Sequence, residues 1–163
     1  MKNNKLETIS KLFEDKEIRS VWDAEKEEYY FSVVDIIGAL TDSNIPRNYW
    51  SDLKRKLKQE GSQLHENIVQ LKMKSQKDVK SYLTDTLDTK GIFRLIESVP
   101  SSRAEPLNLW LAKMGKERID EVFDPELAVN RAVDYYRSRG YNDNWIKARL
   151  TNEIYQEWCG MKV

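Results

Sequence analysis

Two neighbouring stretches decide the fold: residues 31–40 read FSVVDIIGAL, and residues 46–61 read PRNYWSDLKRKLKQEG. The first contains a serine that can cap a helix, followed by apolar residues that recur with helical spacing. The second opens on a proline, which suits the first position of a helix, and closes on a glycine, which suits its end. These signals predict two short consecutive helices, at residues 32–40 and 46–60.

The second of these predicted helices has an apolar face and a basic face. Each residue of a helix is turned by about 100° from the one before it. On this spacing the apolar arc contains Tyr49, Trp50, Leu53 and Leu57. The opposite arc contains Arg47, Ser51, Arg55 and Lys58, with Lys54 at its edge. We therefore expect the helix to bury one side and to offer its basic side to a partner.

Strand-forming residues lie on both sides of the helix pair. Residues 18–22 and 29–31 are rich in strand formers and flank a charged turn, which predicts a β-hairpin. From residue 69 to residue 74 apolar and polar side chains alternate, which predicts a half-buried strand. A turn and a returning strand at residues 79–84 complete a second predicted hairpin. Its polar side chains include Lys72, Lys74, Lys77 and Lys80.

The rest of the sequence is predicted to be helical. Its apolar residues recur with helical spacing between proline and glycine residues that end or start helices. Gly115 lies inside one of these helices, where we expect it to permit close packing. The whole pattern predicts an α+β fold, with two small β-hairpins interleaved with short helices and a helical C-terminal extension. We expect a flexible N-terminal arm at residues 1–12, a domain at 13–120 and the extension at 121–163.

The charged residues are unevenly distributed along the 163-residue chain, although 27 basic and 27 acidic side chains leave no net charge. Residues 1–46 contain six basic and ten acidic side chains, and residues 81–163 contain 12 and 13. Residues 47–80 contain nine basic and four acidic side chains, a net charge of +5. This asymmetry favours one electropositive patch in the middle of the chain. The alternative is a solvated helix face in a charge-rich protein.

The composition excludes several kinds of functional site. One cysteine and one histidine cannot supply an intramolecular disulfide or a His/Cys zinc site from one chain. The glycine-rich loops that hold phosphates in nucleotide-binding proteins are absent from the sequence. No apolar run approaches the ~18–20 residues of a membrane helix, and no signal-peptide-like stretch opens the chain. We therefore expect a cytoplasmic, non-enzymatic binding protein with no cofactor, no metal and no membrane partner.

One short motif would support an enzyme instead. Asp78-Val79-Lys80, with Glu66 upstream, resembles the acidic-plus-lysine sets of nucleases whose carboxylates hold a magnesium ion. The spacing is loose, and such a triplet often arises by chance. Magnesium-dependent cleavage of plasmid DNA that Asp78→Ala abolishes would be needed to support an enzyme.

Three stretches resemble a known protein family. Residues 31–40, followed by a short loop and Pro46-Arg47, are similar to the start of the BRO family N-terminal domain. Residues 49–57, YWSDLKRKL, and residues 104–113, AEPLNLWLAK, resemble the bacterial branch of that family. Such domains occur in prophage antirepressors and baculovirus repeated-ORF proteins, and related regions occur in DNA-damage-inducible protein D. The resemblance covers residues 15–120.

The resemblance implies an antirepressor-like module that binds double-stranded DNA in phage or prophage transcription regulation. Helix 46–60 would lie in a groove, braced by helix 32–40 as in a helix-turn-helix arrangement, and the second hairpin would touch the adjacent backbone. The arginines of the helix suit guanine, the lysines suit phosphates, and the asparagine and serine are further polar readers. The expected DNA-binding residues are Arg47, Asn48, Ser51, Lys54, Arg55, Lys58, Lys72, Lys74, Lys77 and Lys80.

An alternative function follows from relatives that act by binding a repressor protein. The helical extension carries aromatic and apolar residues of the kind that anchor protein interfaces. They are Leu127, Ala128, Tyr135, Tyr136, Trp145 and Trp158. The protein would then bind and inactivate a phage repressor without contacting DNA directly. The same helices could form a homodimer, which would suit a palindromic DNA site.

Overall fold

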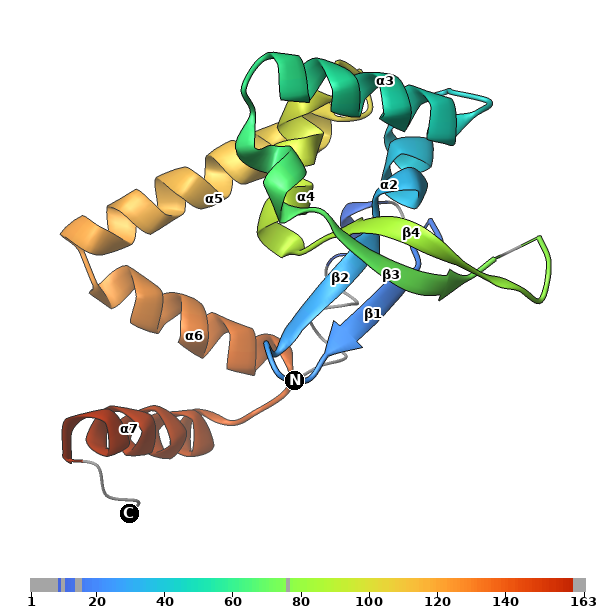
Figure 1. Cartoon of the computed structure of the whole chain (residues 1–163). Coiled ribbons are helices and arrows are strands. Elements are labelled where there is room, and N and C mark those ends of the chain that lie inside the picture. Colours follow the sequence, from blue (N-terminus) through green and yellow to red (C-terminus); the bar gives the residue numbers. More distant parts are fainter. Residues whose placement is uncertain (1–8, 10, 14–15, 76, 160–163) are drawn as a thin grey trace. The chain divides into compact units, whose positions relative to one another are not determined.

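The computed structural model describes residues 9, 11–13, 16–75 and 77–159, with side chains up to residue 154. Most of the arm predicted for residues 1–12 therefore lies outside the described residues. Contacts between Cα atoms divide the chain into two compact units, Met1–Leu111 and Ala112–Val163. The first unit contains a sheet with helices around it, and the second is helical, so the α+β class with a helical extension is confirmed (Figure 1).

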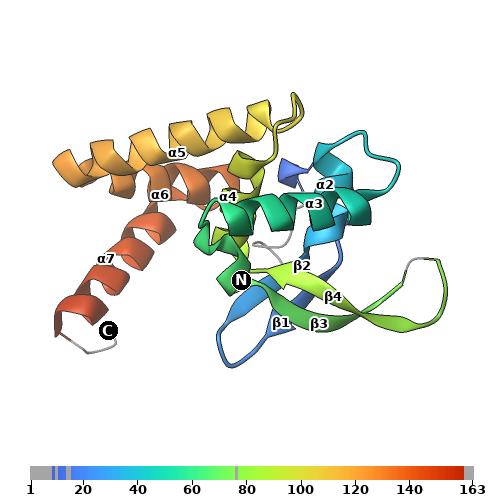
Figure 2. The same cartoon turned by 45° about the horizontal axis from the view of Figure 1, so that its top comes forward.

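The first unit is built on a four-stranded antiparallel sheet in which both predicted hairpins take part. Its strands, in the order β1-β2-β4-β3, are β1 (Ser20–Asp23), β2 (Glu28–Ser32), β4 (Ser81–Leu87) and β3 (Val69–Lys74). In the described part of the chain, β2 meets β4 only where Phe31 lies opposite Leu87 and Ser32 lies opposite Thr86. The outer part of the β3–β4 hairpin therefore projects from the sheet as a two-stranded arm (Figures 1 and 2).

The returning strand of the second hairpin is longer than predicted. β4 begins at Ser81 and ends at Leu87, whereas the sequence predicts a strand from Val79 to Thr84. An isolated carboxylate such as that of Asp85 is unfavourable in a strand. In the structure this carboxylate accepts three side-chain hydrogen bonds, so the strand continues through it into the core. Strand β1 also differs, since it begins at Ser20 and not at the predicted residue 18.

The two helices between the hairpins form as predicted. α2 (Val33–Leu40) is capped by Ser32, whose Oγ accepts a hydrogen bond of 3.4 Å from the backbone N–H of Asp35. α3 (Pro46–Gln59) is followed by Gly61, whose φ of 72° lies in the region that glycine adopts without strain. The predicted apolar face of α3 is confirmed, because its side chains pack into the core of the unit. The buried members are Trp50, Leu53 and Leu57.

One hydrophobic core joins the sheet to the helices of the first unit. It includes α4 (Thr89–Ser98) and the short helix η1 (Gln63–Asn67), as well as α2 and α3. Ile9 and Phe13 of the N-terminal segment are also buried in this core. α4 approaches β4 closely at Gly91, where a Cβ atom would lie 2.9 Å from the Cδ2 atom of Leu87. Only glycine allows this approach without a shift of the buried neighbour.

The second unit contains the end of α5 (Glu105–Phe123), α6 (Glu126–Ser138) and α7 (Asp143–Cys159). Glu121 is buried between two arginines, with oxygen–nitrogen distances of 2.7 Å to Arg131 and 3.4 Å to Arg118. An aromatic cluster joins α6 to α7, in which Tyr141 stacks on Trp145 with ring centroids 4.2 Å apart. Among the described residues, no helix combines the length and the apolar character needed to cross a lipid bilayer.

The close packing predicted at Gly115 is wrong. A Cβ atom added to this residue of α5 would have no neighbouring atom within 4 Å. A glycine inside a helical pattern indicates either a close contact or a helix that tolerates it at a cost in stability. The structure corresponds to the second case.

Candidate nucleic-acid interface

The first unit has an ion pair that fixes α2 to the start of the first hairpin and to the outer end of β3. The guanidinium of Arg19 contacts the carboxylate of Asp35 in two places, at 2.8 Å through Nε and at 2.9 Å through Nη2. The same guanidinium donates hydrogen bonds to the backbone oxygen of Lys74 at 3.0 Å and to the Oγ of Ser32 at 3.2 Å. These hydrogen bonds with Asp35 raise the pKa of Arg19 above its ordinary value, against the opposing effect of burial. The first turn of α2 and the end of β3 are thereby held together.

A second acidic residue, Asp85, joins α3 to the β3–β4 hairpin. Its Oδ2 atom accepts hydrogen bonds of 2.8 Å from the indole nitrogen of Trp50 and 2.8 Å from the ammonium of Lys54. Its Oδ1 atom accepts a hydrogen bond of 3.0 Å from the side-chain amide of Gln70, the cross-strand neighbour in β3. Two residues of α3 and two residues of the hairpin therefore form one polar cluster.

The charge of Asp85 is stabilised by this cluster. Partial burial alone would raise the pKa of the carboxyl group, but the hydrogen bonds from Lys54, Trp50 and Gln70 outweigh it. The pKa of Asp85 consequently lies below its ordinary value. The ammonium of Lys54 is also 5.8 Å from the centre of the Trp50 ring, a distance at which a cation–π attraction operates. Lys54 is thus held against the hairpin, although its side chain is 42% exposed.

Four of the six predicted residues of α3 form a stripe along one side of the helix. Its members, spaced by four, three and four residues, are Arg47, Ser51, Lys54 and Lys58, and we call them the α3 stripe. Because Lys54 contacts Asp85 of β4, the stripe lies on the side of α3 that faces the hairpin. The Oγ of Ser51 donates a hydrogen bond of 2.9 Å to the backbone oxygen of Arg47. Ser51 therefore uses its own donor within the helix.

The other two predicted residues of α3 lie outside the stripe. Asn48 and Arg55 are turned by ~100–120° from Lys54 around the helix axis, and both are exposed. Arg55 forms an ion pair of 2.9 Å with Asp52, in which both side chains are more than 70% exposed. Exposed pairs of this kind contribute at most about 1 kcal/mol, so a phosphate can replace the carboxylate.

The four predicted hairpin lysines are exposed and lie on two parts of the arm. Lys72 and Lys74 alternate with the apolar residues of β3 and share a strand face with Gln70, which points toward α3. Lys77 and Lys80 belong to the loop between β3 and β4. The alternation predicted for residues 69–74 is confirmed, since Met73 is buried between these two exposed lysines.

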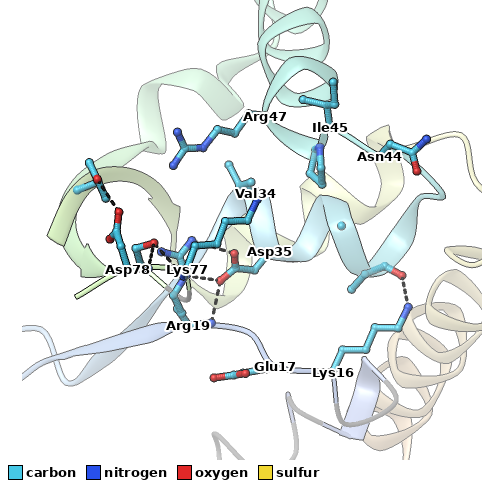
Figure 3. Close-up of a pocket in the computed structure, with 15 residues that line it drawn as sticks. Lys16, Glu17, Arg19, Val34, Asp35, Asn44, Ile45, Arg47, Lys77 and Asp78 are labelled. Carbon is cyan, nitrogen blue, oxygen red and sulfur yellow. Dashed lines mark hydrogen bonds and ion pairs between the residues drawn. The ribbon is translucent and has the colours of Figure 1, made fainter. Parts of the chain in front are cut away.

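A groove of about 750 Å³ runs between the start of α3, α2 and the hairpin loop (Figure 3). Arg47 and Lys77 both line it, so the groove brings together one predicted residue from the helix and one from the hairpin. The Arg19–Asp35 ion pair forms part of its wall. Lys16 also lines it and donates a hydrogen bond of 3.0 Å to the backbone oxygen of Ala39.

The carboxylate of Asp78, considered above for a nuclease, is part of the hairpin loop. It accepts hydrogen bonds of 2.9 Å from the hydroxyl of Tyr82 and 3.0 Å from the backbone N–H of Lys80. These bonds, with the Tyr82 bond the stronger influence, lower the pKa of Asp78. Within the described residues, no cluster of three or more His, Cys, Asp or Glu side chains is arranged to hold a metal ion.

Two residues that position the interface, Arg19 and Asp85, are not among those that the sequence predicts. Arg19 is 16 residues from Asp35, and Lys54 is 31 residues from Asp85, so no local spacing links either pair. A usable signal was present only for Asp85. It is an acidic residue inside a threonine-rich strand, where a charge requires a partner from another element.

The geometry therefore combines a basic helix, a basic two-stranded arm and two acidic residues that hold them in place. No curated protein and no solved structure matches the chain. A family model does match, over residues 17–123, and its description is BRO family, N-terminal domain. The matched residues include the whole sheet and helices α2 to α5. Because this match covers more than half of the 163 residues, the chain belongs to the BRO family through its N-terminal domain.

Proposed function

We propose that the protein is a non-enzymatic, double-stranded DNA-binding regulator of phage or prophage origin, which acts in the cytoplasm as an antirepressor-like protein in transcription regulation. The observation that carries the proposal is the set of cations on α3 and the β3–β4 hairpin. Six of them have no acidic partner among the described residues. They are Arg47, Lys58, Lys72, Lys74, Lys77 and Lys80. Membership of the BRO family supports the same function.

In this proposal α3 lies in the major groove, which admits one helix. Arg47 is the principal base-reading residue, because its guanidinium has no acidic partner in the described structure and can bond guanine through two atoms. Arg55 would first have to leave Asp52, and Asn48 and Ser51 would contribute polar contacts. Lys54 acts differently, because its ion pair with Asp85 holds α3 against the hairpin. The lysines of the hairpin would then contact phosphates beside the groove.

The test is a fluorescence-anisotropy titration of random-sequence duplex DNA at several salt concentrations. The variant Arg47→Ala/Lys58→Ala removes two exposed cations of the α3 stripe. Its matched control is Lys90→Ala/Arg94→Ala, which removes the same charges from exposed positions on α4. Neither substitution touches a buried side chain, so both variants should fold.

We expect the wild type to bind with a dissociation constant of ~10⁻⁴–10⁻⁶ M at physiological salt, as is typical of non-specific binding. With about six phosphate contacts, the logarithm of affinity should fall against the logarithm of salt with a slope of about −5. The stripe variant should bind more weakly, with a slope smaller in magnitude by about 2, and the control should match the wild type. Absence of wild-type binding at low salt would refute the proposal.

A second candidate function is the binding and inactivation of a phage repressor through the helical extension. The observation that favours it is a set of exposed large apolar side chains in the second unit. They include Ile119, Val122, Phe123, Leu127, Tyr135, Tyr141 and Trp145. A homodimer would use side chains of the same kind. The side chain of Trp158, which the sequence also suggests as an anchor, lies outside the described side chains.

Salt separates the two candidate functions. An interface built on apolar and aromatic side chains should change little with ionic strength, whereas DNA binding should weaken steeply. Light scattering as a function of protein concentration tests the homodimer. A dimer that Phe123→Ser converts to a monomer would support it, and a wild-type monomer at all concentrations would exclude it.

A further inference from the structure

The tip of the β3–β4 arm places an apolar side chain where few contacts within the protein are available to it. Val79 is 93% exposed, the most exposed of the large hydrophobic residues in the described structure. Lys77 and Lys80 flank it in the loop, and Lys74 ends the preceding strand. An apolar tip between cations matches the chemistry of DNA, whose stacked bases lie between two rows of phosphates.

The loop that carries Val79 is held in shape by its own hydrogen bonds. Ser75 Oγ accepts hydrogen bonds from the backbone N–H groups of Lys77 at 3.1 Å and Asp78 at 3.3 Å. The backbone N–H of Ser75 donates to the backbone oxygen of Lys80 at 2.9 Å. The carboxylate of Asp78 is also bonded, to Tyr82 and to the backbone of Lys80. Its negative charge is thus engaged within the loop and is outnumbered by the lysines around it.

The arm ends in a loop that lies beyond its last strand pair, Lys74–Ser81. Five cross-strand pairs, from Gln70–Asp85 to Lys74–Ser81, lie beyond the residues of β4 that pair with β2. At about 3.4 Å per residue they give an arm of about 17 Å. Asp85 fixes the base of the arm to α3, and the bond from Arg19 to the backbone oxygen of Lys74 holds its outer end, next to the loop, against the residue before β1. The arm projects in both views of the molecule (Figures 1 and 2).

We propose that this arm enters the minor groove of duplex DNA and that Val79 wedges between two base pairs, so that the bound duplex is bent. The inference rests on the proposed function, because it requires DNA to lie against the arm. An apolar side chain can contact thymine methyl groups in the major groove, but insertion of an apolar side chain between base pairs is typical of proteins that bind the minor groove. Apolar wedges between neighbouring base pairs unstack them and kink the duplex by ~20–90° toward the major groove. The flanking lysines would neutralise phosphates on the two sides of the kink.

The test measures bending separately from binding. A short duplex with a donor dye at one end and an acceptor dye at the other is saturated with protein, and energy transfer between the ends is recorded. Val79→Ser removes the wedge, and Val79→Ile retains an apolar side chain of similar shape. Val122→Ser is the matched control, because Val122 is also exposed, at 68%, but belongs to α5. All the substitutions are at exposed positions, so the variants should fold.

We expect energy transfer to rise when the wild type, Val79→Ile or Val122→Ser binds, and to stay at the value of free DNA with Val79→Ser. The affinity of Val79→Ser should fall by no more than about tenfold, because the phosphate contacts remain. Wild-type binding without a rise in energy transfer would overturn the wedge and leave the proposed function intact. Bending by Val79→Ser equal to that of the wild type would also overturn it. Absence of wild-type binding would refute the proposed function and the wedge together.

A second measurement tests the choice of groove. Inosine in place of guanine removes the amino group from the minor groove and leaves the major-groove pattern unchanged. Fluorescence anisotropy should show that the wild type binds inosine-containing DNA more tightly than guanine-containing DNA, and this gain in affinity should be absent with Val79→Ser. An equal gain for both proteins would show that only the stiffness of the DNA had changed, and would overturn insertion into the minor groove.

Discussion

The replacement Asp85→Ala should destabilise the first unit, because three donors lose their acceptor at once. The indole nitrogen of Trp50 is the important one, since this residue is only 4% exposed and cannot turn to water. An unsatisfied buried donor costs about 1–3 kcal/mol. Lys54 is 42% exposed, and its lost ion pair adds at most about 1 kcal/mol. Gln70 is exposed and can bond to water, so its contribution is close to zero.

Together these losses predict a decrease of about 1–4 kcal/mol in the free energy of unfolding. For a chain of this size the melting temperature should fall by about 3–12 °C. Urea denaturation followed by circular dichroism measures the free energy, and an unchanged dependence on urea concentration would show that the folded state is still compact. Asp85→Asn should lose only about 1 kcal/mol, because the amide oxygen can still accept the indole hydrogen bond.

The reasoning would be refuted if Asp85→Ala unfolded at the same urea concentration as the wild type. That result would mean that the Trp50 indole finds another acceptor, or that α3 is held by its apolar face without help. The variant Lys54→Met separates these effects, because it removes the ion pair but leaves the bond between Trp50 and Asp85. We expect it to unfold within about 1 kcal/mol of the wild type.

Three further predictions concern the first unit and α5. Gly91→Ala should lower the free energy of unfolding in urea by about 1–3 kcal/mol, because its Cβ would lie 2.9 Å from a buried leucine. Gly115→Ala should raise it by about 0.5–1 kcal/mol, because no atom lies within 4 Å of the added Cβ. Arg19→Met should lower the free energy of unfolding by about 2–4 kcal/mol in the same assay, because it leaves the half-buried carboxylate of Asp35 without its partner. A variant as stable as the wild type would contradict this prediction. The low pKa of Asp85 stabilises the fold above its ordinary pKa of about 3.9, and this contribution is lost as the pH falls through the lower native value. In acid titrations the stability difference between wild type and Asp85→Asn should therefore close below about pH 4.

The parts of the fold that the sequence predicts are those governed by local rules. Proline and glycine mark the two ends of α3, and the alternation of side chains in residues 69–74 gives both the strand and its buried face. Ser32 is recognisable as a helix cap because capping depends on a few adjacent residues. These elements carry the predicted basic side chains, so spacing places Arg47, Ser51 and Lys58 on one side of α3, whereas the place of Lys54 in the stripe follows from its contact with Asp85.

The parts that the sequence does not predict depend on contacts between distant residues. The end of β4 depends on an acidic residue whose partners are 15 to 35 positions away. Whether Lys54 is available to a ligand also depends on that contact, since spacing alone cannot distinguish an ion-paired lysine from a free one. Gly115 and Gly91 illustrate the same limit, because both lie in helices and only the structure shows which one has a close neighbour.

Because β3 is an edge strand of the sheet, its lysines also affect how one molecule associates with another. An edge strand presents unpaired backbone N–H and C=O groups, and a strand of another molecule can form hydrogen bonds with them. Lys72 and Lys74 lie on this edge strand, and their charge opposes pairing of the strand with that of another molecule. Alanine at both positions would weaken DNA contacts and also favour aggregation, so that the two effects would be confused. Glutamate at the same positions repels phosphates and still opposes pairing of the edge strand with another molecule, so charge reversal is the better way to probe this strand.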